Sequence, residues 1–425
     1  MKVLVIGSGG REHAIVYSLK KSALVDRLFC TPGNAGTVEL AENPGLAADD
    51  FDSLLHFVKN EKIDLTVVGP EAPLVQGISD LFAGHGLSVF GPSSEGALIE
   101  GSKIFSKELM KKSRIPTADF SEFYDRFSAA KYIKSKKPPY VIKADGLAGG
   151  KGVIITKSAD ESEEVLSAMF EKKIFGESGT KVVIEEFLEG EEATVLALCD
   201  GKNVVPLISS QDHKPVYDGD KGPNTGGMGA IAPAPVVNER VMERVMDRIL
   251  NPLVHELNRR NIVYRGIIYA GLMISDENPS VVEFNCRFGD PEAEAVLPLL
   301  DSDLCDLIFR AVNGELKDVD IKWKHGFSCD VVLVSGGYPG KYEKGKEISG
   351  LEKHVDDNEM VVFHSGTKVM DGRTVTNGGR VLNIVGLGKT LKTAMDRAYR
   401  LVNDINFENM FYRRDIGFRG LKYFP

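Results

Sequence analysis

The sequence is poor in cysteine and has no long apolar run. Its five cysteines are odd in number and widely spaced, with no CxxC pair, so they predict neither a disulfide framework nor a zinc or redox motif. No stretch approaches the roughly 20 apolar residues of a membrane-spanning helix. The apolar run near the start, VLVI, is too short for a signal-peptide core of about 7 to 15 residues. These absences favour a cytoplasmic protein without a membrane partner.

Positive charge is also in deficit. Lys and Arg number 52 against 61 Asp and Glu, a net charge of -9. Binding to a nucleic-acid backbone needs an excess of Lys and Arg on one face, so nucleic acid is excluded as the main partner, although a local basic pocket is not. A length of 425 residues exceeds a single ordinary core of about 250 to 300 residues. We therefore expect two to four domains with clefts between them.

The first hundred residues alternate short β-branched runs with helical patterns. This rhythm predicts a parallel sheet covered by helices, that is, a Rossmann-like α/β domain over residues 1–103. Each run ends in a loop rich in Gly or Pro, and loops at the carboxyl ends of parallel strands should line one cleft. The runs are KVLVI, RLFC, IDLTVVG and LSVFG, and their loops are GSGGRE, TPGNAGT, GPEAPL and GPSSEG.

The pattern changes after Lys103 to a core domain expected over residues 104–326. Within it a small α+β unit, about 123–190, reads as a lid that closes by hinge motion. A long polar loop is expected over 209–230, followed by a helix at Glu239 to Arg260 and by two strands, YRGIIYAGLMI and SVVEFNCRF. Residues 327–425 are strand-rich again, with a helix near Thr390 to Asn403, and form the expected C-terminal domain.

Residues 141–155, VIKADGLAGGKGVII, resemble a Walker A phosphate loop at first sight. That loop needs Ser or Thr after its lysine and a helix behind it. Here Gly152 follows Lys151 and the next segment reads as a strand, so the P-loop is excluded. Two readings stay open. The glycines form a flexible turn that folds amides over phosphates, with Lys143 and Lys151 as point charges, or this is an ordinary hairpin with surface lysines.

The loop Gly7 to Glu12 resembles a dinucleotide-binding GxGxxG turn, but Glu12 replaces the third glycine. A strand that passes through glycines into a helix still favours an anion by roughly 0.3 to 1 kcal/mol. Arg11 would suit a phosphomonoester. The alternative is a packing turn without a ligand.

The sharpest local signal is VVEFNCR at residues 281–287. Residues two apart on a strand share a face, so Glu283, Asn285 and Arg287 should project together while Val282, Phe284 and Cys286 point into the core. A carboxylate and an amide oxygen are hard ligands suited to magnesium, and an arginine beside them would meet an anionic substrate. The alternative is a solvated polar face.

Acids cluster at residues 185–192, EEFLEGEE. They could accept hydrogen bonds from ribose hydroxyls or hold a lysine, and the backbone at Phe187 and Leu188 could read an adenine edge. The alternative is that most of these glutamates are simply solvated. His213, a lone loop histidine, reads as structural.

Taken together, the motifs resemble the phosphoribosylamine–glycine ligase family of the ATP-grasp superfamily. The resemblance runs in order from about residue 1 to 420, and RFGDPE at Arg287 to Glu292 is its most specific segment. The motifs are GSGGREH, PGNAG, GPEAPL, GSK, VIKADGLAGGKGV, EEFLEGEE, SQDHK, GPNTGGMGA, EFNCRFGDPE and TNGGR.

The resemblance implies an N-terminal parallel-sheet domain, an ATP-grasp core with a small α+β lid, and a C-terminal mixed β-rich domain. It implies that ATP phosphorylates the carboxylate of glycine and that the amine of 5-phosphoribosylamine attacks the glycyl phosphate. The products are glycinamide ribonucleotide, ADP and phosphate, in purine biosynthesis, with Mg²⁺ or Mn²⁺ as cofactor. We expect a monomer. Whether the unstable amine arrives free or through transient contact with the enzyme that supplies it is left open.

The resemblance also implies roles for individual residues. For ATP these are Lys103 and Lys143 at the phosphates, Gly149, Gly150, Lys151 and Gly152 in the loop above them, and Glu185, Glu186, Leu188 and Glu191 at the adenosine. The metal ligands are Glu283 and Asn285. For phosphoribosylamine they are Gly9, Gly10, Arg11, Glu12, Asn34 and Glu71, and the loop closing over both substrates holds Asp212, Lys214, Asn224, Thr225, Gly226 and Gly227. We assign glycine to Arg287, which can fork onto a carboxylate, and Asp290, which can receive an ammonium.

Two departures from the pattern stand out. Many ATP-grasp enzymes carry a second metal carboxylate on the neighbouring strand, but YAGLMI offers none. Either one carboxylate suffices, with substrate phosphates completing the shell, or the second comes from elsewhere. Gly149 stands where alanine is frequent. Two rival functions are an ATP-grasp enzyme that activates formate or bicarbonate, against which RFGDPE and GPNTGGMG speak, and a nucleotide-binding regulator without turnover, which has no need of a metal pair.

Overall fold

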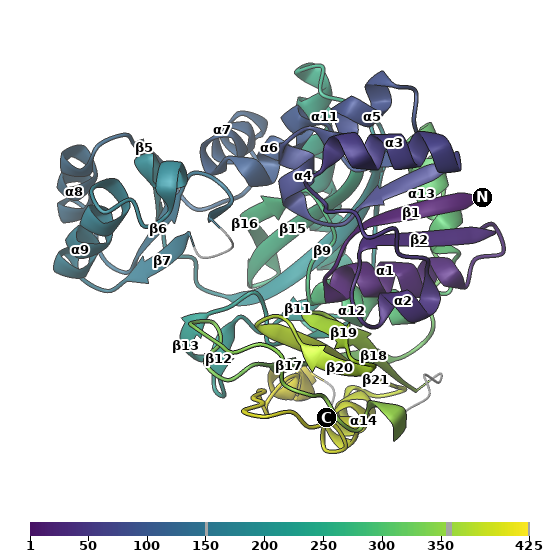
Figure 1. The fold of residues 1–425 in the computed structure, drawn as a ribbon. Helices are drawn as coiled ribbons and strands as arrows, with labels where there is room; N and C mark the ends of the chain where they lie inside the picture. Colours follow the sequence, from purple (N-terminus) through teal and green to yellow (C-terminus); the bar gives the residue numbers. More distant parts are fainter. Residues whose placement is uncertain (149–151, 354–358, 424–425) are drawn as a thin grey trace.

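The computed structural model describes residues 1–148, 152–353 and 359–423. Three bodies surround a central region (Figure 1). The lid projects at the left of the view, the N-terminal body and the central core sheet lie at the upper right, and the C-terminal body lies below. Within the described ranges, no helix is long and apolar enough to cross a membrane.

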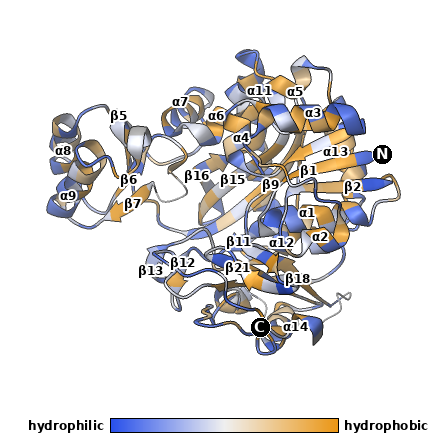
Figure 2. Cartoon of the chain, in the orientation of Figure 1, coloured by the Kyte–Doolittle hydropathy of each residue, from blue (hydrophilic) through white to orange (hydrophobic). Residues whose placement is uncertain are grey.

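The N-terminal body holds the predicted parallel sheet, with strand order β2-β1-β3-β4. The strand β1 (Lys2–Gly7) is almost wholly buried, because helices cover both faces of a parallel sheet. Figure 2 shows these strands as largely hydrophobic. The other strands are β2 (Arg27–Pro32), β3 (Leu65–Val68) and β4 (Val89–Phe90), and the helices are α1 (Gly10–Lys20), α2 (Thr37–Leu40), α3 (Phe51–Glu61), α4 (Glu71–Val75), α5 (Ile78–Gly84), α6 (Ser94–Gly101) and α7 (Lys103–Ser113).

The core sheet is antiparallel, in the order β10-β9-β15-β16. The helix predicted from Glu239 to Arg260 is present as three consecutive segments, with a π-helical turn from Met246 to Leu250 in the middle. Pro252 follows this turn and has no N–H to donate, which accounts for the break in the α-helical pattern. The elements are β9 (Glu191–Asp200), β10 (Val204–Pro206), β15 (Arg265–Ser275), β16 (Asn278–Asn285), α10 (Glu239–Val245), α11 (Asn251–Arg259), α12 (Glu292–Val296) and α13 (Leu304–Asn313).

The lid is an antiparallel sheet in the order β5-β8-β6-β7 with two helices against it. It has a small hydrophobic core of its own, which includes Ile133, Ile142 and Leu166. The glycine-rich stretch joins β6 to β7, so its predicted strand-loop-strand setting is confirmed. The elements are β5 (Phe120–Phe123), α8 (Arg126–Lys134), β6 (Tyr140–Ala144), β7 (Val153–Thr156), α9 (Ala159–Phe170) and β8 (Val182–Glu186).

The C-terminal body is built on an antiparallel sheet in the order β11-β14-β17-β21-β18, against which α14 (Leu391–Val402) packs. The segment predicted as one long polar loop over 209–230 contains short strands. It contains a short hairpin, β12 (Pro215–Tyr217) with β13 (Lys221–Asn224), and its ends are β11 (Gln211–Asp212) and β14 (Gly229–Ala232). Both ends join the C-terminal sheet, although they precede residue 327. The proposed domain limits stay a prediction. The remaining strands are β17 (Phe327–Val334), β18 (Met360–His364), β19 (Thr367–Met370), β20 (Arg373–Thr376) and β21 (Arg380–Gly388).

Candidate active site

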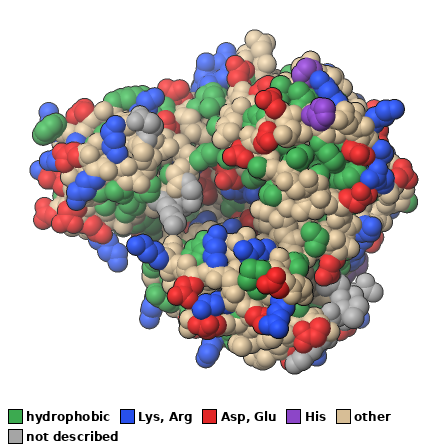
Figure 3. Space-filling view, in the orientation of Figure 1, with side chains coloured by type: hydrophobic (Ala, Val, Ile, Leu, Met, Phe, Trp, Pro, Cys, Tyr) green, Lys and Arg blue, Asp and Glu red, His purple; other side chains and the backbone are tan. Residues whose placement is uncertain are grey.

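The predicted site residues that the structure describes gather where the three bodies meet. Figure 3 shows this face hollowed between the lid, the N-terminal body and the C-terminal body, with charged side chains inside the hollow. The carboxyl ends of β1 and β3, the end of β16 and the lid strands β6 and β8 all supply residues to it. The cleft expected from the loops of the parallel sheet therefore has three walls.

The two predicted metal ligands lie at the end of β16. Glu283 pairs with Gly271 and Asn285 with Tyr269 on the neighbouring strand β15, which puts both side chains on one face. The register shifts between Gly271 and Leu272, so Val282 is an extra residue in a bulge. This corrects one expectation, because Val282 is only partly buried and Val281 fills the core in its place.

The charge around Glu283 suits a metal bound to phosphates. Burial would raise the pKa of its carboxyl, but attraction by Lys103, Lys214 and Lys143 outweighs burial and lowers the pKa. Glu283 is therefore an anion at neutral pH. No group of three or more His, Cys, Asp or Glu that could hold a metal occurs among the described residues. One carboxylate and one amide oxygen fit Mg²⁺, which binds through one or two carboxylates and substrate phosphates.

Lys143 on β6 is held by an ion pair within the lid and by a contact with the core. Its Nζ lies 2.9 Å from Glu185 Oε1 and donates to Val282 O at 2.9 Å. The other oxygen of Glu185 lies 3.0 Å from Nζ of Lys107, a buried lysine of α7 that the sequence analysis missed. Burial and the charge of Lys143 lower the pKa of Lys107 to about 8, although Glu185 opposes them. The only available signal was its position four residues after Lys103, one helical turn away.

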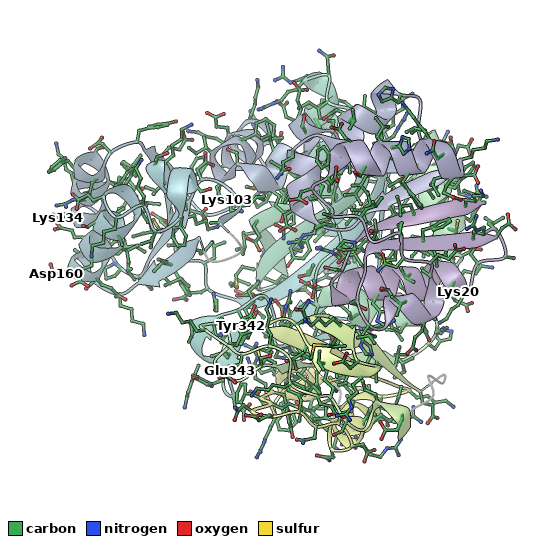
Figure 4. All side chains as sticks on the ribbon, viewed as in Figure 1. Lys20, Lys103, Lys134, Asp160, Tyr342 and Glu343 are labelled. Carbon is green, nitrogen blue, oxygen red and sulfur yellow. The ribbon has the colours of Figure 1, made fainter. Side chains whose placement is uncertain are left out.

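Lys103 begins α7 at the junction of the lid with the rest of the molecule, as Figure 4 shows. Asp145, at the base of the glycine-rich stretch, accepts hydrogen bonds from Ser102 Oγ at 2.9 Å and from Ile104 N at 3.1 Å. The lid therefore docks on the first turn of the helix that carries Lys103. Asp145 is the second functional candidate that the sequence analysis missed.

The glycine-rich loop itself is described only at its base. Ala144 N donates to Gly152 O at 2.8 Å, which closes the β6–β7 hairpin. The predicted residues Gly149, Gly150 and Lys151 lie outside the described residues.

The adenosine residues separate into two groups. Neighbours on a strand point to opposite faces, so Glu185 is buried against the lysines whereas Glu186 is exposed and pairs with Lys136 at 3.1 Å. Leu188 is partly buried just beyond β8. Glu191, at the start of β9, binds Lys422 of the C-terminal segment at 2.9 Å.

Polar and charged groups of the predicted sugar-phosphate loop bind one another. Gly9 N donates to Glu12 Oε2 at 2.6 Å, and Arg11 Nε lies 2.6 Å from Glu12 Oε1. One amide that the sequence offered to a phosphate is thus bound by the chain itself. A Cβ on Gly7 or Gly69 would lie within 2.6 Å of the Glu12 side chain, so glycine is required beside it.

Asn34 and Glu71 stand at the edges of this loop. Asn34 Nδ2 donates to Ser8 O at 2.9 Å and to His364 O at 2.6 Å, which ties the loop to the C-terminal body. Glu71 lies 3.3 Å from Arg287. Burial would raise the pKa of Glu71, but Arg287 and Arg11 lower it to about 2.

Arg287 and Asp290, the residues assigned to glycine, each have a partner of opposite charge. Arg287 also pairs with Glu100 at 3.0 Å. Asp290 Oδ1 lies 3.1 Å from Arg380 Nη1, and the same nitrogen donates to Asp290 O and to Gly226 O. Arg380 belongs to the TNGGR motif, to which the sequence analysis gave no role. It joins two of the predicted substrate loops.

The loop expected to close over both substrates lies against the same cleft. Lys214 Nζ pairs with Glu192 at 2.8 Å, and burial together with Glu292 raises the pKa of Asp212. Thr225 Oγ1 donates to Lys214 O, Gly227 N donates to Thr225 Oγ1, and Gly226 N donates to the hydroxyl of Tyr338. Asn224 is exposed at the end of β13.

Comparison with known proteins places this arrangement among ATP-grasp ligases. Models of the phosphoribosylglycinamide synthetase N domain, ATP-grasp domain and C domain match residues 1–100, 101–293 and 328–419. The phosphoribosylamine–glycine ligase of Caldanaerobacter subterraneus is 48% identical over 98% of this chain and 99% of its own. That of Escherichia coli K12 is 47% identical over 99% of both chains.

Solved structures agree. The crystal structure of phosphoribosylamine–glycine ligase from Thermotoga maritima has a TM-score of 0.86 at 36% identity, covering 98% of this chain and 100% of its own. The biotin carboxylase domain of a Hydrogenobacter thermophilus 2-oxoglutarate carboxylase, solved with MgADP and bicarbonate, has a TM-score of 0.75 at 16% identity, covering 100% of this chain and 98% of its own. The second likeness is one of fold alone.

Proposed function

The chain belongs to the phosphoribosylglycinamide synthetase family, and from this premise we propose how its residues divide the work of the family's reaction. The enzyme is an ATP-dependent phosphoribosylamine–glycine ligase. It joins glycine to 5-phosphoribosylamine and forms glycinamide ribonucleotide in purine biosynthesis.

At the nucleotide, Lys103 and Lys143 hold the phosphates of ATP. Gly149, Gly150 and Lys151, which lie outside the described residues, also bind the phosphates, and the Glu185 to Glu191 segment receives the adenosine. The position of Lys143, held between Glu185 and Val282 O, supports this role. Phosphoryl transfer leaves little covalent work for the protein, so positioning and charge neutralisation dominate.

At the amino acid, Arg287 binds the carboxylate of glycine and Asp290 its ammonium group. One carboxylate oxygen attacks the γ-phosphorus, the bond to the β-phosphate oxygen breaks, and glycyl phosphate and ADP result. The ion pairs of the partly buried Arg287 with Glu71 and Glu100 fix its guanidinium and support this step.

Phosphoribosylamine binds between the Gly9 to Glu12 loop and the Asn224 to Gly227 loop, with Asn34, Glu71, Asp212 and Lys214 around it. Its amine nitrogen attacks the carbonyl carbon of glycyl phosphate, phosphate leaves with the electron pair of the C–O bond, and the nitrogen loses a proton. Hydrogen bonds from Gly226 N to Tyr338 and from Gly227 N to Thr225 hold the backbone of the second loop in place, which supports a preformed binding site.

Glu283 and Asn285 are the residues that would hold Mg²⁺ or Mn²⁺, which would neutralise phosphate charge when bound. The observation that carries the whole proposal is the position of the Glu283 carboxylate among cationic side chains from α7, the lid and the C-terminal side of the cleft. We also propose a cytoplasmic monomer. All five cysteines are buried and unpaired, which is in keeping with a reducing compartment.

The test is an assay of the purified chain with ATP, Mg²⁺, labelled glycine and freshly made phosphoribosylamine. ADP should form only when all are present, and mass spectrometry should find the label in glycinamide ribonucleotide. Formate or bicarbonate in place of glycine should give no product. ADP formation with either acid in place of glycine, or none with the full mixture, would overturn the assignment.

A further inference from the structure

Three buried charges form a row between α7 and the lid. Lys107, Glu185 and Lys143 are each about 95% buried or more, and the carboxylate lies in the middle, with one lysine on each oxygen at 3.0 and 2.9 Å. Lys107 comes from α7, outside the lid, whereas the other two belong to lid strands. The row is thus an electrostatic connection between two bodies.

Both ends of the row are anchored on the same piece of β16. Lys107 Nζ donates to Thr117 Oγ1 at 2.7 Å, and Thr117 donates to Val281 O at 2.6 Å. Lys143 donates to Val282 O. The two carbonyls immediately precede Glu283. The two lysines therefore fix the position of the lid relative to the end of β16, which carries the proposed metal ligands.

The balance of two lysines and one carboxylate in this row determines the role of Lys107. A buried carboxylate without a cation costs several kcal/mol, so Glu185 must keep a partner whenever Lys143 turns towards a phosphate. Lys107 is fixed by Thr117 and stays. With Lys107 removed, Glu185 would have Lys143 as its one remaining cation in the row and would compete with ATP for it.

We propose that Lys107 is a positioning residue that acts through Glu185, leaving Lys143 available to the phosphates of ATP. The inference rests on the proposed role of Lys143. Lys107 itself touches no reacting atom. It sets the affinity for nucleotide and has little influence on the affinity for glycine.

The test compares Lys107→Met, Lys107→Arg and a control in the full-length protein. Lys107→Met should raise KM for ATP about tenfold or more, with KM for glycine changed less than about twofold. Lys107→Arg retains the charge and should recover most of the affinity. The control is Lys112→Met on the same helix, whose lysine is exposed and lies 3.9 Å from Glu256, and it should match wild type.

A double-mutant cycle separates positioning from general stability. If Lys107 acts through Glu185, Lys107→Met should change KM for ATP less than about twofold in a Glu185→Gln background. Equal effects in both backgrounds, or a folded Lys107→Met with wild-type KM for ATP, overturns the inference. If Lys107→Met does not fold by circular dichroism, Lys107→Gln replaces it, and failure of both to fold shows a structural role and also overturns it.

Calorimetric binding of a non-hydrolysable ATP analogue keeps this test independent of the ligase reaction. A protein that makes no glycinamide ribonucleotide yet loses analogue affinity in Lys107→Met would refute the proposed function and retain the inference. If the wild-type protein is an active ligase and Lys107→Met binds the analogue with unchanged affinity, the inference is refuted and the proposed function is retained.

Discussion

Glu283 is the carboxylate proposed to bind the metal, and it lies among several cationic side chains. Replacing it by Gln keeps its shape and removes its charge, so a bound metal would lose its one carboxylate ligand. We expect Glu283→Gln to bind ATP measurably but to lower kcat by roughly 100-fold or more. Steady-state kinetics and nucleotide titration measure the two effects. The control Glu277→Gln removes an exposed carboxylate and should behave as wild type, and near-normal turnover in Glu283→Gln would refute the metal assignment.

Substitution of Arg380 should affect the use of glycine and leave the use of ATP nearly unchanged. Its Nη1 connects Asp290 with Gly226, so Arg380→Met leaves a largely buried carboxylate unpaired and frees the substrate loop. We expect kcat/KM for glycine to fall about 10- to 100-fold, with KM for ATP nearly unchanged. Arg373→Met, which removes an exposed partner of Glu347, serves as the control. A larger effect on ATP than on glycine would contradict this role.

At the scale of elements, we expect the lid to be the part that moves. It has a separate small core, and its described polar contacts with the rest include those of Asp145, Lys143 and Glu185. We expect ATP with Mg²⁺ to close it and to slow tryptic cleavage within residues 123–190 by roughly fivefold. Mapping the fragments by mass spectrometry locates the cuts. Cleavage in the C-terminal body serves as the internal reference, and equal lid cleavage with and without nucleotide would count against closure.

The elements also show what a sequence can reveal. The parallel strands were predictable because runs such as KVLVI must be buried on both faces, and the β6–β7 hairpin because a strand follows Lys151. The β12–β13 hairpin was missed because its strands are short and largely exposed, so no hydrophobic alternation marks them.

Among the site residues, the alternation in VVEFNCR placed Glu283 and Asn285 together correctly, but the bulge that moved Val282 depends on pairing with β15. Lys107 and Asp145 were missed for a related reason. A lysine on a helix and an acid before a glycine look solvated until a distant strand or helix end is seen to bind them. Contacts across long sequence separations leave little trace in local pattern.

For the whole molecule, buried histidines predict a loss of stability in acid. Burial lowers the pKa of His213 and of His364 to about 4, and that of His13 well below its usual range. Between pH 6.5 and 4 these histidines bind protons in the unfolded chain but remain largely neutral in the folded protein. The free energy of unfolding therefore falls as pH drops through this window, by up to roughly 3 kcal/mol for each histidine that reaches about 4.

Urea unfolding at pH 7 and pH 5 measures this effect. His213→Gln should weaken the dependence on pH, whereas His56→Gln, which changes an exposed histidine, should leave it unaltered. The comparison isolates the histidine because carboxylates contribute equally to both proteins. An identical pH dependence in His213→Gln and wild type would show that the protonated form of His213 is accommodated in the fold.

The cations of the cleft are paired with carboxylates of the protein itself, and this pairing affects both substrate binding and product release. Lys143 has Glu185, Arg287 has Glu71 and Glu100, and Lys214 has Glu192. A substrate anion that engages one of these cations exchanges one partner for another, so its net gain in binding energy is modest. The reverse exchange is equally easy when ADP and phosphate depart, because the carboxylates return to their cations. We therefore expect this cleft to bind its ligands with modest affinity and to release its products rapidly.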